Sequence, residues 1–224
     1  MKLIASEPVL IHADDVALQG DLAMPEAPIG LVLFAHGSGS SRHSPRNRLV
    51  ASMLNDADIG TLLFDLLTPD EDVGLRRRFD IALLSDRLRA ATQSVKSLAR
   101  QRSLRLGYFG ASTGAAAAVR AAADPPARMH IDAVMSRGGR VDLAGHEALS
   151  RLASPLLMIV GEADPVVVNL SARAAAWMTC EKRLEVIPGA THLFEEPGAM
   201  ELVARLASNW FRDHLAGGAE GKAG

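Results

Sequence analysis

The stretch Leu104-Arg-Leu-Gly-Tyr-Phe-Gly-Ala-Ser-Thr-Gly114 decides the fold, because it joins a short apolar run to a serine flanked by glycines. Residues 104–109 have the composition of a buried strand, and the alanine-rich residues 112–123 favour a helix. Gly-x-Ser-x-Gly at such a junction needs small residues, because the strand and the helix nearly touch across the turn. The motif therefore predicts a tight turn that projects the Ser112 hydroxyl above a sheet. The alternative is an ordinary turn in which Ser112 only caps the helix.

Further apolar runs on both sides of this motif have the length of buried strands, and each is bounded by Gly, Pro, Asp or Ser. They lie at residues 31–34, 61–64, 131–135, 156–160 and 184–187. Stretches with helical spacing lie at residues 79–100, 168–178 and 199–215. Residues 8–24 alternate instead, which predicts an N-terminal β-hairpin. A hairpin followed by strand–helix units indicates an α/β fold whose mostly parallel sheet carries helices on both faces.

Length and composition exclude several classes of protein. The chain has 224 residues, a formal net charge of −2 and a single cysteine. The near-zero charge argues against a nucleic-acid binder, and one cysteine excludes a disulfide framework or a Cys-based zinc cluster. No segment approaches the apolar length of a membrane span, and the N-terminus lacks the apolar core of a signal peptide. We therefore expect a soluble cytoplasmic protein with one domain over residues 1–215 and a flexible tail over residues 216–224.

Two other strand ends carry the residue types that activate a serine. Asp164 follows the run at 156–160, and His192 follows the run at 184–187. A serine hydroxyl is a weak nucleophile that needs a base, and the base needs an acid to orient it. Taken singly, Asp164 is typical of a turn and His192 of a loop. Their chain order after Ser112, and the position of all three at strand ends, predict a Ser-His-Asp triad.

The loop after the first long strand, Ala35-His-Gly-Ser-Gly-Ser-Ser41, predicts an oxyanion hole. The backbone N–H groups of Ser38 and Thr113 would donate to the negative oxygen of a tetrahedral intermediate, and the glycines let the backbone approach closely. A phosphate-binding loop is the rival interpretation, but the Gly-Lys-Ser/Thr element that it needs is absent. We expect His36 to form structural hydrogen bonds rather than to act as a second base.

These motifs together resemble the α/β-hydrolase superfamily, and the compact length resembles its dienelactone-hydrolase-like branch. The resemblance rests on His36-Gly37, Gly110–Gly114, Asp164 and His192, and it spans essentially the whole chain. Longer stretches such as Pro188–Glu196 resemble a bacterial subgroup of this branch, some of whose members resemble domains fused to phosphoribosyltransferases. This sequence contains no phosphoribosyltransferase segment, so the resemblance does not extend to that activity.

Two departures from the family pattern matter. Dienelactone hydrolases use a cysteine nucleophile, whereas Ser112 stands at that position here and Cys180 falls at a predicted helix end. The resemblance therefore implies acyl-ester chemistry rather than dienelactone as the substrate. Many relatives also insert a helical cap after the sixth strand, but residues 136–154 leave room for only one helix. We therefore expect an α/β-hydrolase fold with no large cap domain.

Basic residues follow two strand ends at the same predicted edge of the sheet. Arg42, His43 and Arg137 are candidates to hold an anionic group of the substrate, because arginine suits bidentate carboxylate binding. The alternative is salt bridging to acids such as Asp65 and Glu195.

The sequence thus favours a serine hydrolase that cleaves a small carboxylic ester through an acyl-enzyme. It predicts no cofactor, no metal, no nucleic-acid or membrane partner, and a monomer or homodimer. Thioesterase, amidase or acyltransferase activity on the same triad stays open, as does a non-catalytic ligand-binding module. A nucleotide-binding α/β protein is disfavoured, because both common phosphate-binding motifs are absent. Residues 65–78 are either a solvated connection or a gate over the pocket.

Overall fold

The computed structural model describes residues 5–127 and 129–216 and contains one eight-stranded sheet. The strands are β1 (Ser6–Ala13), β2 (Val16–Ala23), β3 (Gly30–Ala35), β4 (Ile59–Phe64), β5 (Arg105–Ala111), β6 (Ala133–Arg137), β7 (Leu156–Gly161) and β8 (Lys182–Ile187). Their order in the sheet is β1-β2-β4-β3-β5-β6-β7-β8. The hairpin β1–β2 and the pair β2–β4 are antiparallel, and the remaining neighbours are parallel. The carboxyl ends of β3 to β8 therefore meet at one edge.

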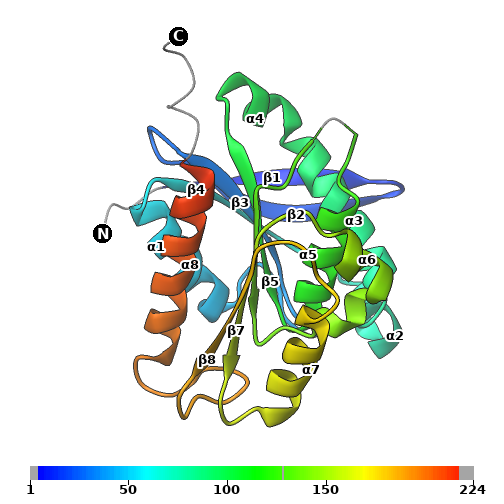
Figure 1. Ribbon diagram of the computed structural model, residues 1–224. Coiled ribbons are helices and arrows are strands. Elements are labelled where there is room, and N and C mark those ends of the chain that lie inside the picture. Colours follow the sequence, from blue (N-terminus) through cyan, green and yellow to red (C-terminus); the bar gives the residue numbers. More distant parts are fainter. Residues whose placement is uncertain (1–4, 128, 217–224) are drawn as a thin grey trace.

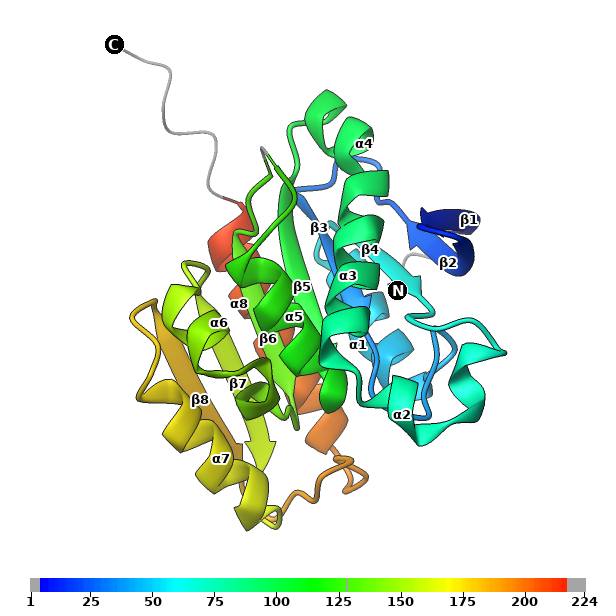
Figure 2. The ribbon, with the colours of Figure 1, turned by 90° about the vertical axis from the view of Figure 1, so that its right-hand side faces the viewer.

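Helices cover both faces of this sheet, as Figures 1 and 2 show. They are α1 (Pro45–Asp56), α2 (Leu75–Arg78), α3 (Ile81–Ser94), α4 (Lys96–Gln101), α5 (Thr113–Ala123), α6 (His146–Arg151), α7 (Pro165–Ala175) and α8 (Ala199–Leu215). Two 3₁₀ turns, η1 (Glu71–Val73) and η2 (Val141–Ala144), complete the set. Helices α1 and α8 lie together on one face, whereas α3, α5, α6 and α7 lie on the other.

Strands β3 to β7 are buried on both faces, which explains why they read as continuous apolar runs, whereas the edge strand β8 is partly exposed. In β5, Tyr108 packs into the core beneath α3 and α5, and Phe109 packs into the core beneath α1 and α8. The Tyr108 hydroxyl lies 2.6 Å from the Thr92 hydroxyl, so its polar end is also satisfied. The two cores fix the sheet between its helical layers and hold the strand ends in place.

The fold confirms the predicted α/β-hydrolase class, with its N-terminal hairpin, its mostly parallel sheet and its lack of a large cap domain. Only η2 and α6 lie in the connection between β6 and β7. No described helix has the combined length and apolar character that a membrane span requires. The predicted tail beyond Ala216 lies outside the described residues.

Helices α1 and α3 are among those that differ from the prediction. Helix α1 was not predicted from the sequence. Ser44 caps it by accepting a hydrogen bond from the Asn47 N–H, and Pro45 occupies its first position. The predicted helix at 79–100 divides at Val95 and begins after Phe79, because Asp80 is its N-cap. Phe79 therefore lies outside the buried helix face and is 53% exposed.

Candidate active site

Ser112 lies on a strained turn between β5 and α5. Its backbone has φ 50° and ψ −120°, a conformation that residues with a Cβ rarely adopt. The surrounding backbone holds it there: the Ser112 N–H donates to the carbonyl of Arg137 at 3.2 Å, and the Ser112 carbonyl accepts from the Arg140 N–H at 3.1 Å. The strained turn places Ser112 at the carboxyl edge of the sheet, as the motif predicts.

The two glycines of the motif are required by close backbone packing. A Cβ on Gly110 would overlap the Cα of Ala115 in α5. A Cβ on Gly114 would overlap the carbonyl oxygen of Ala35 at the end of β3. Strand β5, helix α5 and the end of β3 therefore meet with no room for a side chain at either position.

We expect Gly114→Ala to lower the free energy of unfolding by about 3 kcal/mol, because backbone rather than a movable side chain must shift. Gly74→Ala is the matched control: Gly74 has φ −116°, and a Cβ added there would meet no heavy atom within 4 Å. Urea denaturation of both variants measures the difference. Equal midpoints for the two variants would contradict the close packing.

Asp164 follows the end of β7 and contacts the side chain of His192. It is the N-cap of α7, and its Oδ1 accepts from the Val167 N–H at 3.3 Å. Its Oδ2 lies 2.7 Å from the Nδ1 of His192. The Asp164 side chain is 16% exposed and that of His192 is 40% exposed. The carboxylate therefore favours the tautomer with a proton on Nδ1, which leaves Nε2 of His192 free to accept a proton.

These three side chains line one pocket of about 530 Å³. Apolar groups of Phe79, Leu143 and Val167 form part of its wall, and Arg140 also lines it. No hydrogen bond joins the described side chains of Ser112 and His192, which is common before a substrate tightens a site. The structure thus brings all three predicted residues to one pocket and supplies wall residues that the sequence analysis missed. Of these, Arg140 follows the end of β6 at the same edge of the sheet, a position that the sequence could have signalled.

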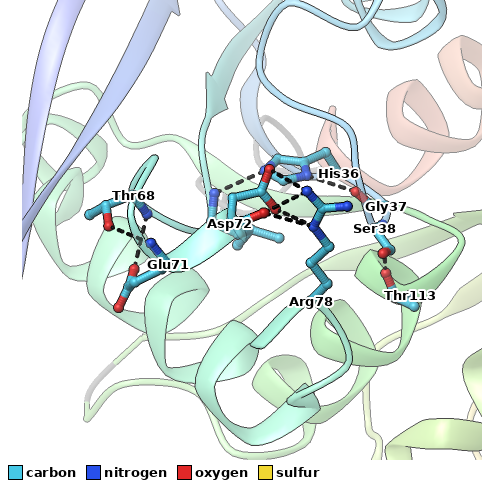
Figure 3. A network of polar contacts seen from close by, with 9 residues as sticks. His36, Gly37, Ser38, Thr68, Glu71, Asp72, Arg78 and Thr113 are labelled. Carbon is cyan, nitrogen blue, oxygen red and sulfur yellow. Dashed lines mark hydrogen bonds and ion pairs between the residues drawn. The ribbon is translucent and has the colours of Figure 1, made fainter. Parts of the chain in front are cut away.

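The predicted oxyanion loop contacts the serine turn directly. The Ser38 N–H donates to Oγ1 of Thr113 at 2.9 Å, which ties the loop after β3 to the first residue of α5 (Figure 3). His36 lies behind the loop, where its Nδ1 contacts the Gly37 carbonyl at 3.0 Å and its Nε2 accepts from the Leu66 N–H at 3.0 Å. Both ring nitrogens are used within the fold, as expected for a structural histidine.

Burial lowers the pKa of His36 below its ordinary value of 6.5. Between the two pKa values the unfolded chain binds a proton that the folded chain does not, so stability should fall as the pH drops below about 6.5. We expect the melting temperature of His36→Gln to fall less between about pH 7.5 and about pH 5 than that of the wild type. Parallel thermal melts measure this, and identical pH slopes would contradict it.

Comparison with known proteins places the chain in a family. Residues 28–207 match the family described as "Alpha/beta hydrolase domain". The chain belongs to this family. It is also 47% identical to a structure of dienelactone hydrolase from Anabaena variabilis, with a TM-score of 0.89 over 95% of this chain and 99% of that one. The chain therefore has an α/β-hydrolase fold of the dienelactone-hydrolase-like type.

Two further similarities are informative in different ways. A Mycobacterium tuberculosis protein named "Putative phosphoribosyl transferase" is 53% identical over 214 residues, which are 96% of this chain and 48% of that protein. The chain therefore spans about half the length of that curated relative. The esterase domain of a Rhodothermus marinus protein superposes with a TM-score of 0.75 at 17% identity, covering 95% of this chain and 100% of that one. At that identity the likeness shows the fold alone.

The three basic residues that the sequence offered as substrate contacts do not line the pocket of Ser112. Arg42 forms an ion pair with Asp65, the alternative that the sequence analysis had weighed. His43 accepts a hydrogen bond from Arg48 at 2.8 Å. Arg137 is 8% exposed, and burial lowers the pKa of its guanidinium to about 10. None of the three lines the pocket of Ser112, so their role toward an anionic substrate stays a prediction.

Residues 65–78 contain η1 and α2, and they border the small cavity at the oxyanion loop rather than the pocket of Ser112. Glu71 in η1 is buried and accepts from the Thr68 N–H at 2.9 Å and from Arg87 at 3.1 Å. Asp72 pairs with Arg78 of α2 at 2.8 Å, and Figure 3 shows this pair next to the oxyanion loop. This network anchors the segment between β4 and α3, and whether the segment gates the pocket stays a prediction. Within residues 5–127 and 129–216, no three or more His, Cys, Asp and Glu side chains are grouped so that they could hold a metal ion.

Proposed function

We propose that this hydrolase is a serine hydrolase that cleaves small carboxylic esters through an acyl-enzyme on Ser112. One observation carries the proposal: the His192 Nδ1–Asp164 Oδ2 contact of 2.7 Å lies in the same pocket as the strained Ser112. A histidine oriented by a carboxylate next to a projected serine is the arrangement that activates a hydroxyl toward carbonyl groups.

The first half of the reaction forms the acyl-enzyme. Ser112 Oγ attacks the ester carbonyl carbon while Nε2 of His192 takes the hydroxyl proton. Asp164 keeps His192 in the required tautomer and stabilises its charged form. The carbonyl oxygen becomes an oxyanion that N–H groups at the start of α5 can stabilise. The tetrahedral intermediate then collapses: the C–O bond to the alcohol breaks, and His192 returns its proton to the leaving oxygen.

The second half regenerates the serine with water. His192 removes a proton from a water molecule as its oxygen attacks the acyl carbon. Collapse of the second intermediate breaks the bond to Ser112 Oγ, which regains its proton from His192, and the carboxylic acid leaves. No redox step or added group is needed for this balance. The pocket volume of about 530 Å³ and its partly apolar wall of Phe79, Leu143 and Val167 favour a small substrate with an apolar portion.

The experiment that tests the proposal is the intact mass of the protein after treatment with a fluorophosphonate. We expect one covalent adduct on the wild type and none on Ser112→Ala. A panel of p-nitrophenyl esters, thioesters and anilides, each with and without an added alcohol acceptor, then separates esterase from thioesterase, amidase and acyltransferase activity. A folded wild type with neither adduct nor turnover would overturn the proposal and favour a ligand-binding module.

A further inference from the structure

The Thr113 side chain holds an unused hydrogen-bond donor inside the site. Thr113 is the first residue of α5 and is only 3% exposed. Its Oγ1 accepts from the Ser38 N–H at 2.9 Å, and it donates its own proton to no described residue. A hydroxyl carries one donor as well as its acceptor sites, and a buried donor without a partner is uncommon. The unused proton therefore calls for an explanation.

The position of Thr113 lets its hydroxyl donate a hydrogen bond to a group bound in the pocket of Ser112. Thr113 lines the pocket of Ser112 and His192, and it also borders a small cavity formed by the oxyanion loop around Ser38. Thr113 therefore lies between the oxyanion loop and the pocket in which a substrate carbonyl would meet Ser112. Figure 3 shows the Ser38–Thr113 contact beside His36 and Gly37 of the oxyanion loop.

The Ser38–Thr113 contact limits direct donation from the oxyanion loop to a substrate. The Ser38 N–H already donates to Thr113, so direct donation to a substrate oxygen would break an existing hydrogen bond. A hydroxyl that accepts a hydrogen bond becomes a stronger donor through its own proton, because linked hydrogen bonds polarise one another. The pair can therefore act in series, with the Ser38 N–H polarising the Thr113 O–H.

We propose that the Thr113 hydroxyl donates a hydrogen bond to the oxyanion, beside the Thr113 backbone N–H, while the Ser38 N–H acts through this hydroxyl. The inference rests on the proposed serine mechanism and assigns Thr113 a second donor in it. No bond to Thr113 forms or breaks, and the hydroxyl keeps its proton throughout. Ser38, which the sequence analysis placed in direct contact with the oxyanion, becomes the residue that positions and polarises Thr113.

Two substitutions at one position separate the hydroxyl from the shape of the side chain. Thr113→Val removes the hydroxyl and keeps the branched shape, and we expect it to lower kcat by about 100-fold with little change in KM. Thr113→Ser restores the hydroxyl and should recover most of the lost rate. Thr92→Val is the matched control, because Thr92 is also buried and its hydroxyl contacts only Leu88 and Tyr108 among the described residues. This control should lose stability but not ester turnover.

The decisive readout is binding of an alkylboronic acid, which forms a tetrahedral adduct on Ser112. In Thr113→Val, the boronate affinity should fall by about the same factor as kcat/KM, whereas a merely structural change would lower the melting temperature without that match. An active wild type with Thr113→Val equally fast or faster would overturn the inference and leave Ser38 as a direct donor. A wild type with no fluorophosphonate adduct and no ester turnover would instead overturn the serine mechanism, and this inference with it.

Discussion

Replacing Asp164 with asparagine should lower kcat for ester hydrolysis by about 10⁴-fold, with almost no change in the melting temperature. The reason is that Asp164 has two separable tasks. Its Oδ2 orients His192 through a 2.7 Å contact, and its Oδ1 caps α7 by accepting from the Val167 N–H. Asparagine is as good an N-cap as aspartate, so the helix keeps its cap. An amide cannot stabilise a charged His192, and it can hold the ring in the wrong tautomer.

Asp164→Ala is the companion variant that removes both tasks. It should show a comparable loss of kcat and, in addition, a loss of about 1 kcal/mol in the free energy of unfolding, the usual cost of deleting an N-cap. Steady-state kinetics and urea denaturation of the two variants measure both effects. If Asp164→Asn kept kcat within about tenfold of the wild type, His192 would not depend on this carboxylate.

The local turn at Ser112 could be predicted from the sequence because its constraints are local. Gly110 and Gly114 are small for steric reasons that the motif itself encodes, and the structure shows the backbone atoms that a side chain would hit. The positions of Asp164 and His192 followed from a general property of parallel sheets, whose strand ends converge at one edge. The apolar runs gave the positions of those strands. The alternation of strands and helices along the chain predicted a parallel sheet, whose strands end at one edge.

Side-chain directions beyond the strand ends could not be predicted, because they depend on contacts between distant segments. Arg137 is an example: β6 is buried on both faces, so its sequence gives no signal that the Arg137 guanidinium turns toward Asn47 in α1. The sequence could name Asp65 as a partner of Arg42, 23 residues away, but it could not decide between that ion pair and contact with a substrate. The Ser38–Thr113 contact spans 75 residues of chain and has no signature in either segment.

Replacing Ser112 with glycine should abolish turnover while making the protein more stable than Ser112→Ala. Both variants lose the proposed nucleophile, and loss of a catalytic serine reduces kcat by about a million-fold in known Ser-His-Asp triads. They differ in the backbone, because φ 50° and ψ −120° at this position strain any residue with a Cβ and suit glycine.

The size of that stability difference follows from two opposing terms. Strain of this kind costs about 1–3 kcal/mol, and glycine forfeits about 0.4–1 kcal/mol through the greater freedom of its unfolded chain. The balance predicts that Ser112→Gly exceeds Ser112→Ala by about 1 kcal/mol, measurable as a higher urea midpoint at an unchanged denaturant slope. Equal midpoints would mean that the strain at Ser112 only offsets the loss of about 0.4–1 kcal/mol that glycine brings, and a lower midpoint for the glycine variant would mean that the turn stores no strain. A higher midpoint for the inactive glycine variant would mean that holding the Ser112 hydroxyl at the edge of the sheet lowers the stability of the fold. A role of this hydroxyl in catalysis would account for that loss.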